Sequence, residues 1–340
     1  MLTNYSSVNP QIWMGRVDDP HDRESFRFHQ VIKTIDLNKL SKIRVDRSKF
    51  NVVLLGFRSD EGIRRNLGRP GAQLGPEYIR RELANLPVTF DENIEVYDAG
   101  DIYTIGQNLE DAQDQLANAV EILLDLGMFP VLLGGGHEIA LGHYNGIVNH
   151  FEHQGQKPSI GIINFDAHFD LRPYKEGYGS SGTMFAQIAD NCKSKQRPFN
   201  YMVLGIQTYA NTISLFKRAQ QLGTRYILAK DMTEDRFDAV WQAIDGFIRD
   251  NDHIYLTICS DVFNAAFAPG VSATQPFGLH PETVLYFLKK IIATGKVLSW
   301  DIAEISPRFD HDNRTAKLAA VLIYAVINEI KSLPAYHKNL

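Results

Sequence analysis

The sequence has few of the features that mark secreted or membrane-spanning proteins. Only two cysteines, Cys192 and Cys259, occur among 340 residues, which is too few for a disulfide framework and fits a reducing compartment. No apolar run approaches the roughly 20 residues of a transmembrane helix. The first residues, Met1–Ser7, contain no basic region followed by an apolar stretch, as a signal peptide would. We therefore expect no membrane span and a cytoplasmic location.

Charge of one sign is not in excess either. The chain has 35 Lys and Arg against 40 Asp and Glu, a formal net charge of −5. The absence of a long basic run and of a basic amphipathic helix argues against partners such as nucleic acid or anionic membranes. Internal repeats and low-complexity segments are absent as well. The chain is 44% hydrophobic, so it can bury a large core and needs no disulfide bonds or structural metal ions to be stable.

Short apolar runs alternate with longer helical patterns. Strands are expected at Asn51–Gly56, Ile94–Tyr97, Phe129–Leu133, Ser159–Phe165, Tyr201–Gly205, Thr224–Leu228, His253–Ile258 and Lys296–Asp301. Helices are expected at Pro76–Leu83, Leu109–Leu126, Ile139–His150, Thr212–Gln221, Asp238–Asp250, Pro281–Ala293 and Asn313–Ser332. This alternation predicts an α/β fold, in which helices cover both faces of one mostly parallel sheet of about eight strands.

We expect residues 49–335 to form a single domain, on which a polar extension (residues 1–48) packs. The polar stretch Lys193–Arg197 is interpreted as a solvated loop. Ligands of such a sheet bind beyond the carboxyl ends of its strands. Residues that follow the apolar runs are therefore the candidates for function.

Asp166, His168 and Asp170 follow one of these runs at alternate positions. In an extended strand alternate side chains share a face, so Asp166 and His168 can reach one point. A strand that rises about 3.3 Å per residue would leave Asp170 roughly 13 Å from Asp166. The chain must therefore turn near His168 or Phe169 for all three to cluster as metal ligands. Ordinary polar capping of a strand end is the alternative.

His137 follows three glycines, Gly134–Gly136, after another expected strand. Glycines let the backbone turn sharply and present the histidine at the strand end, where it could bind a metal. A glycine-rich turn could instead cradle a phosphate, but neither a following Lys-Ser or Lys-Thr nor a dinucleotide fingerprint is present. A capping or core role for His137 is the remaining alternative.

Three further candidates follow the last two expected strands. Cys259 and Asp261 alternate at the end of one strand, and Glu304 lies just beyond the other. On its own, Cys259 would more often be a small buried hydrophobic residue. A turn or capping role is the alternative for Asp261, and a solvated or capping role is the alternative for Glu304. Other histidines, His143 among them, lack partners at a suitable spacing and are interpreted as core or surface residues. The candidates together suit a pair of divalent cations such as Mn²⁺, which could share and ionise a water molecule.

These motifs in this order resemble the ureohydrolase (arginase/agmatinase) family. The resemblance covers most of the chain and rests on Gly75–Arg80, Gly134–His137, Asp166–Asp170, Ala268–Gly270 and Glu304. It implies one three-layer α/β/α domain, a binuclear manganese site and hydrolysis of a C–N bond in a guanidino or amidino group. Members of the family commonly self-associate, so a homo-oligomer is expected on this resemblance alone.

Some features resemble the formimidoylglutamase branch in particular. They are Arg172, the run Ser180–Phe185 and the run Ala268–Ala273. The branch hydrolyses N-formimidoyl-L-glutamate to L-glutamate and formamide in histidine degradation. Arg172 suits such an amidino dicarboxylate, because arginine binds carboxylates bidentately and would repel a cationic substrate. A surface ion pair is the alternative for Arg172. Phe185 stands where arginase has a histidine, which disfavours arginine as the substrate.

The resemblance also implies roles for individual residues. One metal would be held by His137, Asp166, Asp170 and Cys259, and the other by Asp166, His168, Cys259 and Asp261. Asp170 would protonate the leaving amine, and Glu304 would hold the amidinium group. Ser181 and Thr183 lie where family members contact the carboxylate end of the substrate.

The chain departs from the family at position 259, where the pattern has a bridging aspartate and this chain has cysteine. A thiolate is soft and favours Zn²⁺ or a similar ion over Mn²⁺. Asn264 and Ala265 also replace the Asp-Pro of arginase, a change that the formimidoylglutamase branch is expected to tolerate. Two alternatives stay open at this point: another amidino- or guanidino-acid hydrolase and, because of Cys259, a metal-poor, non-catalytic paralogue.

Overall fold

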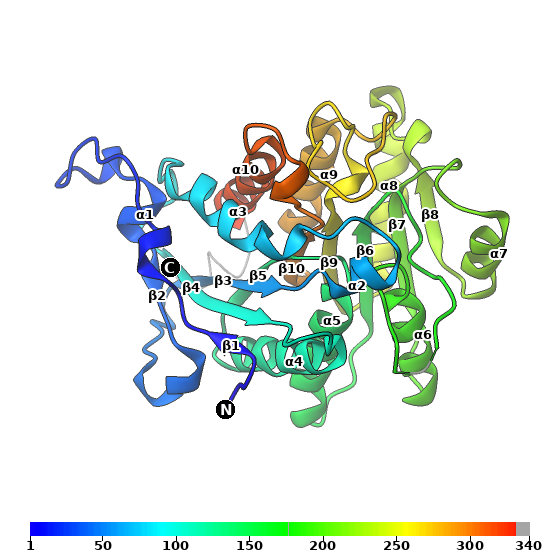
Figure 1. Cartoon of the computed structure of the whole chain (residues 1–340), viewed down its shortest axis with the longest axis horizontal. Helices are drawn as coiled ribbons and strands as arrows, with labels where there is room; N and C mark the ends of the chain where they lie inside the picture. The colour runs from blue at the N-terminus through cyan, green and yellow to red at the C-terminus, as the bar shows by residue number, and fades with distance from the viewer. Residues whose placement is uncertain (176, 331–340) are drawn as a thin grey trace.

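The computed structural model describes residues 1–175 and 177–330 (Figure 1). Within these ranges one ten-stranded sheet has the strand order β1-β4-β3-β5-β10-β9-β6-β7-β8, and β2 pairs with β4 outside this path. The strands are β1 Tyr5–Ser6, β2 Lys33–Thr34, β3 Phe50–Arg58, β4 Ile94–Tyr103, β5 Phe129–Leu133, β6 Ile160–Phe165, β7 Asn200–Ile206, β8 Arg225–Leu228, β9 His253–Cys259 and β10 Val297–Ala303. All pairs are parallel except β1 with β4.

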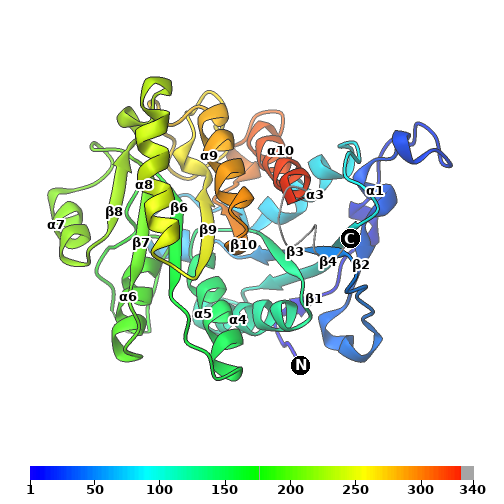
Figure 2. The same cartoon turned by 180° about the vertical axis from the view of Figure 1, so that it is seen from behind.

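Helices cover both faces of the sheet, so the fold is a three-layer α/β/α sandwich (Figures 1 and 2). The face above the sheet in Figure 1 carries α3 Gly75–Ala84, α8 Phe237–Arg249, α9 Pro281–Ala293 and α10 Arg314–Glu329. The opposite face carries α4 Leu109–Asp125, α5 Ile139–His153, α6 Met184–Ser194 and α7 Ile213–Gln221. The short helices α1 Phe28–Val31 and α2 Glu61–Arg65 complete the set within the described ranges.

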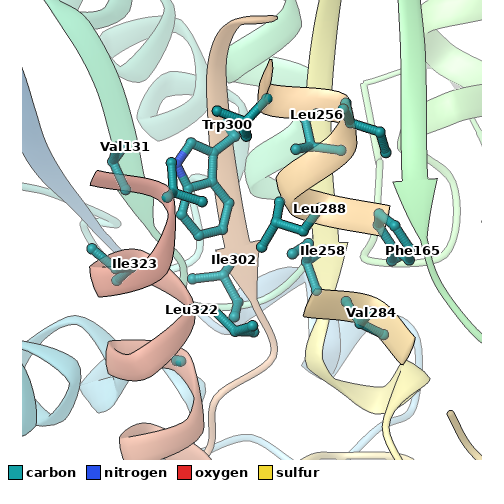
Figure 3. Close-up of a cluster of buried hydrophobic side chains, with 14 of the residues drawn as sticks. Val131, Phe165, Leu256, Ile258, Val284, Leu288, Trp300, Ile302, Leu322 and Ile323 are labelled. Carbon is teal, nitrogen blue, oxygen red and sulfur yellow. The ribbon is translucent and has the colours of Figure 1, made fainter. Parts of the chain in front are cut away.

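Side chains of the central strands alternate between the two cores. In β3, Val52 and Leu54 face one helix layer while Val53 and Leu55 face the other. This alternation is the two-residue period of a strand. Because both faces are covered, the run Val52–Leu55 is apolar throughout. Figure 3 shows the first core, in which the fully buried Trp300 of β10 packs among side chains of β9, α9 and α10.

The expected α/β architecture is confirmed, and each expected strand forms. The structure adds β1 and β2, which lie in the polar extension and pair with β4. It also adds α1, α2 and α6. The interpretation of Lys193–Arg197 as a loop was partly wrong, because Lys193 and Ser194 form the last turn of α6. The expected end of the last helix at Ser332 lies outside the described residues.

The extension is anchored by specific contacts. Phe28 is fully buried in the core, and the indole Nε1–H of Trp13 donates to Asp98 Oδ2 at 2.7 Å. The division of the chain at residue 48 stays a prediction. No helix in the described part of the chain has both the length and the apolar character that crossing a bilayer requires.

Candidate functional site

The candidate residues meet at one edge of the sheet. Strands β5, β10, β9 and β6 are consecutive neighbours, and their carboxyl ends deliver His137, Glu304, Cys259 and Asp166 respectively. His137, His168, Asp170, Cys259, Asp261 and Glu304 all line a cavity of about 340 Å³. Parallel order alone explains the convergence, because adjacent parallel strands end on the same side.

The glycine turn after β5 packs closely against neighbouring backbone segments. The N–H groups of Gly134, Gly135 and Gly136 donate to the carbonyls of Ile302, Phe57 and Ser59 at 2.8, 2.7 and 2.8 Å. A Cβ atom on Gly135 would lie 1.8 Å from the Ser59 carbonyl oxygen, so only glycine fits there. Because these donors are all used by the backbone, the phosphate-cradle alternative is wrong. The turn instead fixes His137, whose own N–H donates to Glu304 Oε1 at 3.0 Å.

Hydrogen bonds around His137 fix its tautomer. Thr257 Oγ1 donates its only proton to Asp301 Oδ1 at 2.6 Å, so it must accept from His137 Nε2–H, 3.0 Å away. The Nδ1 lone pair of a neutral His137 then faces the carboxylate oxygens Asp166 Oδ2 at 3.1 Å and Asp170 Oδ2 at 3.0 Å. A lone pair among carboxylates is repulsive, so a positive charge must lie between them. Either a proton or a metal ion supplies it.

His168 makes the second half of the cluster. Its Nδ1 lies 3.1 Å from Asp261 Oδ2 and 3.4 Å from Asp166 Oδ1. Asp261 Oδ1 is buried and has no hydrogen-bond partner among the described residues, which suits a metal ligand. The potential ligand atoms form two groups, each within 4.8 Å: His137, Asp166 and Cys259, and Asp166, His168 and Asp261. Asp166 belongs to both groups, so this donor set fits two ions that share one carboxylate.

Two catalytic candidates have strained backbones. Asp170 and Glu304 have φ angles of 49° and 68°, in the left-handed region that residues other than glycine rarely adopt. At Asp170 this completes the turn that brings its carboxylate to His137, after the chain bends at Ala167 and His168. At Glu304 the N–H donates to Gly135 O at 2.8 Å while the side chain lines the cavity. Such strain is common at functional sites.

Crowding of acidic groups shifts their pKa values strongly. Burial, with Asp166 nearby, raises the pKa of Asp170 to about 6. Burial on its own would raise the pKa of Asp166, but hydrogen bonds from His137 and His168 outweigh it and hold the pKa far below its usual range. Burial and the surrounding carboxylates raise the pKa of the Cys259 thiol well above its ordinary value. A cation bound here would offset this repulsion.

Of the three residues expected to bind substrate, two line the cavity and one does not. Arg172 is exposed and lines the cavity, and no described residue forms an ion pair with it, so the surface-pair alternative finds no support. Ser181 lines the cavity as well. Thr183 lies at the start of α6, where its hydroxyl donates to Ser180 O at 3.1 Å and accepts from Ser180 N–H at 2.8 Å. These contacts give Thr183 a structural role, and its substrate contact stays a prediction.

Sequence reasoning missed several residues that shape the site. Thr257 precedes Cys259 by two positions, so strand alternation would have placed it on the same face. Asp301 accepts the hydrogen bond from Thr257, and the buried His143 in turn contacts Asp301, with His143 Nδ1 2.6 Å from Asp301 Oδ2. Asn211 ties down the turn after β6: its side chain donates to Ala167 O at 2.8 Å and accepts from Phe169 N–H at 3.1 Å. Nothing in the local sequence singles out Asn211.

Comparison with known proteins agrees with this geometry. The family model described as the arginase family matches residues 50–328. The chain belongs to the arginase family. It is 49% identical over 330 residues to a formimidoylglutamase of Clostridium tetani, with 97% of each chain covered. It is 44% identical to a formimidoylglutamase of Legionella pneumophila, covering 96% of this chain and 98% of the relative.

Solved structures share the fold of this arginase-family chain. The formimidoylglutamase of Bacillus subtilis superposes with a TM-score of 0.76 at 22% identity, covering 92% of this chain and 94% of that one. A Trypanosoma cruzi formiminoglutamase solved with Mn²⁺ gives a TM-score of 0.73 at 24% identity, covering 88% and 99%. At these identities the likeness establishes the fold.

Proposed function

We propose that this arginase-family enzyme hydrolyses N-formimidoyl-L-glutamate to L-glutamate and formamide. The observation that carries this proposal is identity over nearly the whole chain: the formimidoylglutamase of Clostridium tetani matches 97% of it at 49% identity. The cavity chemistry supports the same substrate, because an acidic floor suits the amidinium group and Arg172 suits a carboxylate. A role in histidine degradation, the cytoplasmic location and a homo-oligomeric state stay predictions.

We further propose that the ligand cluster holds two divalent ions. His137, Asp166, Asp170 and Cys259 would hold one, and Asp166, His168, Cys259 and Asp261 the other. Bound there, the ions would supply a water molecule that ionises near neutral pH. Mn²⁺ suits the carboxylate and imidazole ligands, whereas the Cys259 thiolate favours Zn²⁺ or another softer ion.

The protein's own groups then orient the substrate and move a proton. The Glu304 carboxylate accepts hydrogen bonds from the amidinium group and turns the formimidoyl carbon toward the attacking water. Attack forms the C–O bond, and the bond between that carbon and the glutamate nitrogen breaks. Asp170, whose carboxylate lines the cavity 3.0 Å from His137 Nδ1, delivers a proton to the departing nitrogen. The products are formamide and glutamate.

The alternative of a metal-poor, non-catalytic paralogue is disfavoured. It arose from Cys259, yet the Cys259 sulfur lies within 4.8 Å of potential ligand atoms of His137 and Asp166. A cysteine at this place can still ligate as a thiolate. The choice between this substrate and another amidino or guanidino acid is a matter for assay.

A panel of substrates tests the proposal. Purified enzyme with Mn²⁺ or Zn²⁺ is assayed for formamide from N-formimidoyl-L-glutamate, and for urea or ammonia from arginine, agmatine and guanidino acids. We expect formamide from the first substrate alone, and its loss in His168→Asn, which removes a ligand. Faster urea release from a guanidino acid would contradict the assigned substrate. Turnover unchanged in His168→Asn would contradict the site.

A further inference from the structure

A second arginine lines the cavity that holds Arg172. Arg69 lies in the loop between α2 and α3, far from Arg172 in sequence, and both are solvent-exposed cavity residues. The cavity therefore has an acidic floor and two cations. Sequence reasoning gave no signal for Arg69, because a single arginine in a loop is usually just a surface residue.

Backbone carbonyls hold the Arg69 side chain in place. Its Nε–H donates to Ser272 O at 3.0 Å and an N–H on Nη2 donates to Val271 O at 2.8 Å. The guanidinium group also lies 4.3 Å from the ring centroid of Phe309. The backbone N–H of Arg69 donates to Ser272 Oγ at 2.8 Å. The group is thus oriented by several contacts, while Nη1 makes none of these hydrogen bonds and can bind a ligand.

These contacts orient the charge of Arg69 without neutralising it. Carbonyl oxygens are dipoles, and among the described residues no carboxylate forms an ion pair with Arg69 or Arg172. Neighbouring arginines differ: Arg64 and Arg65 both pair with Glu61. A fixed, uncompensated guanidinium at a cavity wall is a preorganised anion site, because little side-chain freedom is lost when the anion binds.

We propose that Arg69 binds one of two carboxylates of the substrate, so that Arg69 and Arg172 form separate carboxylate subsites. The inference rests on the proposed function and deepens it. N-formimidoyl-L-glutamate carries one cationic amidinium and two carboxylates, and the cavity offers an acidic floor and two cations. This charge pattern selects an amidino dicarboxylate over an amidino monocarboxylate.

Substrate analogues that each lack one carboxylate test the proposal. N-formimidoyl-L-2-aminobutyrate lacks the side-chain carboxylate, and 4-(formimidoylamino)butyrate lacks the α-carboxylate. We expect Arg69→Gln to lower kcat/KM for the full substrate roughly ten- to hundredfold, mainly through KM, since a hydrogen bond to a charged group contributes about that much. For the analogue that lacks the carboxylate bound by Arg69, kcat/KM of Arg69→Gln should be almost the same as that of the wild type. Arg172→Gln should likewise leave kcat/KM almost unchanged for the other analogue, which lacks the carboxylate bound by Arg172.

Arg308→Gln is the matched control. Arg308 also lies over the Phe309 ring, at 5.7 Å, but does not line this cavity, so its loss should leave all three rates unchanged. Arg69→Lys keeps the charge without the planar fork and should recover part of the loss. An equal loss of kcat/KM on all three substrates in Arg69→Gln would overturn the subsite.

A binding measurement separates this inference from the proposed function. If the wild-type enzyme released no formamide, the proposed function would fail, and calorimetry with L-glutamate, L-2-aminobutyrate and 4-aminobutyrate would still test Arg69. We expect L-glutamate to bind most tightly, and Arg69→Gln to bring its affinity down to that of one monocarboxylate. Equal weakening of all three ligands, or no weakening, would refute the carboxylate role of Arg69.

Discussion

Thr257 donates its hydroxyl proton to Asp301 across 2.6 Å inside the fully buried centre of the sheet. Asp301 also accepts from the Tyr255 hydroxyl at 2.6 Å and lies 2.6 Å from His143 Nδ1. With its proton directed to Asp301, the Thr257 hydroxyl can only accept from His137. The ring nitrogen that His137 presents to the proposed metals is therefore determined by Thr257, which is not itself one of the proposed ligands.

Replacement of Thr257 by valine should weaken metal binding. The substitution would remove the acceptor for His137 Nε2–H and so release the tautomer, and loss of such a supporting contact typically costs about 10–100-fold in metal affinity. Titration of the metal-free protein against a competing chelator measures the effect. Thr257→Ser keeps the hydroxyl and is the matched control. Equal metal affinity in Thr257→Val and the wild type would show that Asp301 and Thr257 only fill space.

Cys259 should determine which metal the enzyme prefers. Cobalt(II)-loaded wild type is expected to show thiolate-to-metal charge-transfer absorption, because a coordinated thiol is deprotonated despite the raised pKa of Cys259. Cys259→Ser should lose this absorption. Cys259→Asp should shift the relative affinity from Zn²⁺ toward Mn²⁺, since carboxylate is the harder ligand. Absorption that persists in Cys259→Ser would place the sulfur outside the coordination sphere.

Removal of the metals should destabilise the fold. The ligand side chains crowd several acidic groups into one buried cluster, and a ligand that binds only the folded state stabilises it by about 2.7 kcal/mol at 100 times its Kd. Scanning calorimetry should show a lower Tm after treatment with a chelator and recovery when Mn²⁺ is restored. Because ligands must lose their protons to bind, this gain should shrink as the pH falls. A Tm independent of metal at neutral pH would argue against the cluster.

The architecture could be predicted from the sequence because the central strands are apolar on both faces and most of them are followed by a helical pattern. The runs around Val52 and Val131 show this directly, and their parallel order also predicts which edge carries the site. Asp166 and Cys259 were found because each directly follows such a run, and His137 because only a glycine turn separates it from one. Local pattern is enough in these cases.

Residues whose role depends on distant partners were not predictable in this way. Arg69 has a role only because the loop at Ser272 and the ring of Phe309 fold against it, and Asn211 only because it reaches back to Ala167. Strands β1 and β2 were missed because each has two residues, too few for an alternating pattern to show. Contacts between residues far apart in the sequence decide all of these features, and such contacts leave no periodic trace in the sequence.

Replacement of the buried Arg80 should destabilise the protein without changing its metals. Arg80 forms a bidentate pair with Asp98, both hydrogen bonds being 2.8 Å, and donates to Asp101 Oδ1 at 2.6 Å. Arg80→Ala would leave buried carboxylates unpaired, which costs about 3–5 kcal/mol of unfolding free energy. Arg81→Ala, on an exposed neighbour, should change it by less than about 0.5 kcal/mol. Denaturant unfolding of the metal-loaded variants measures both, and equal stabilities would mean that water reaches Asp98 and replaces the lost partner.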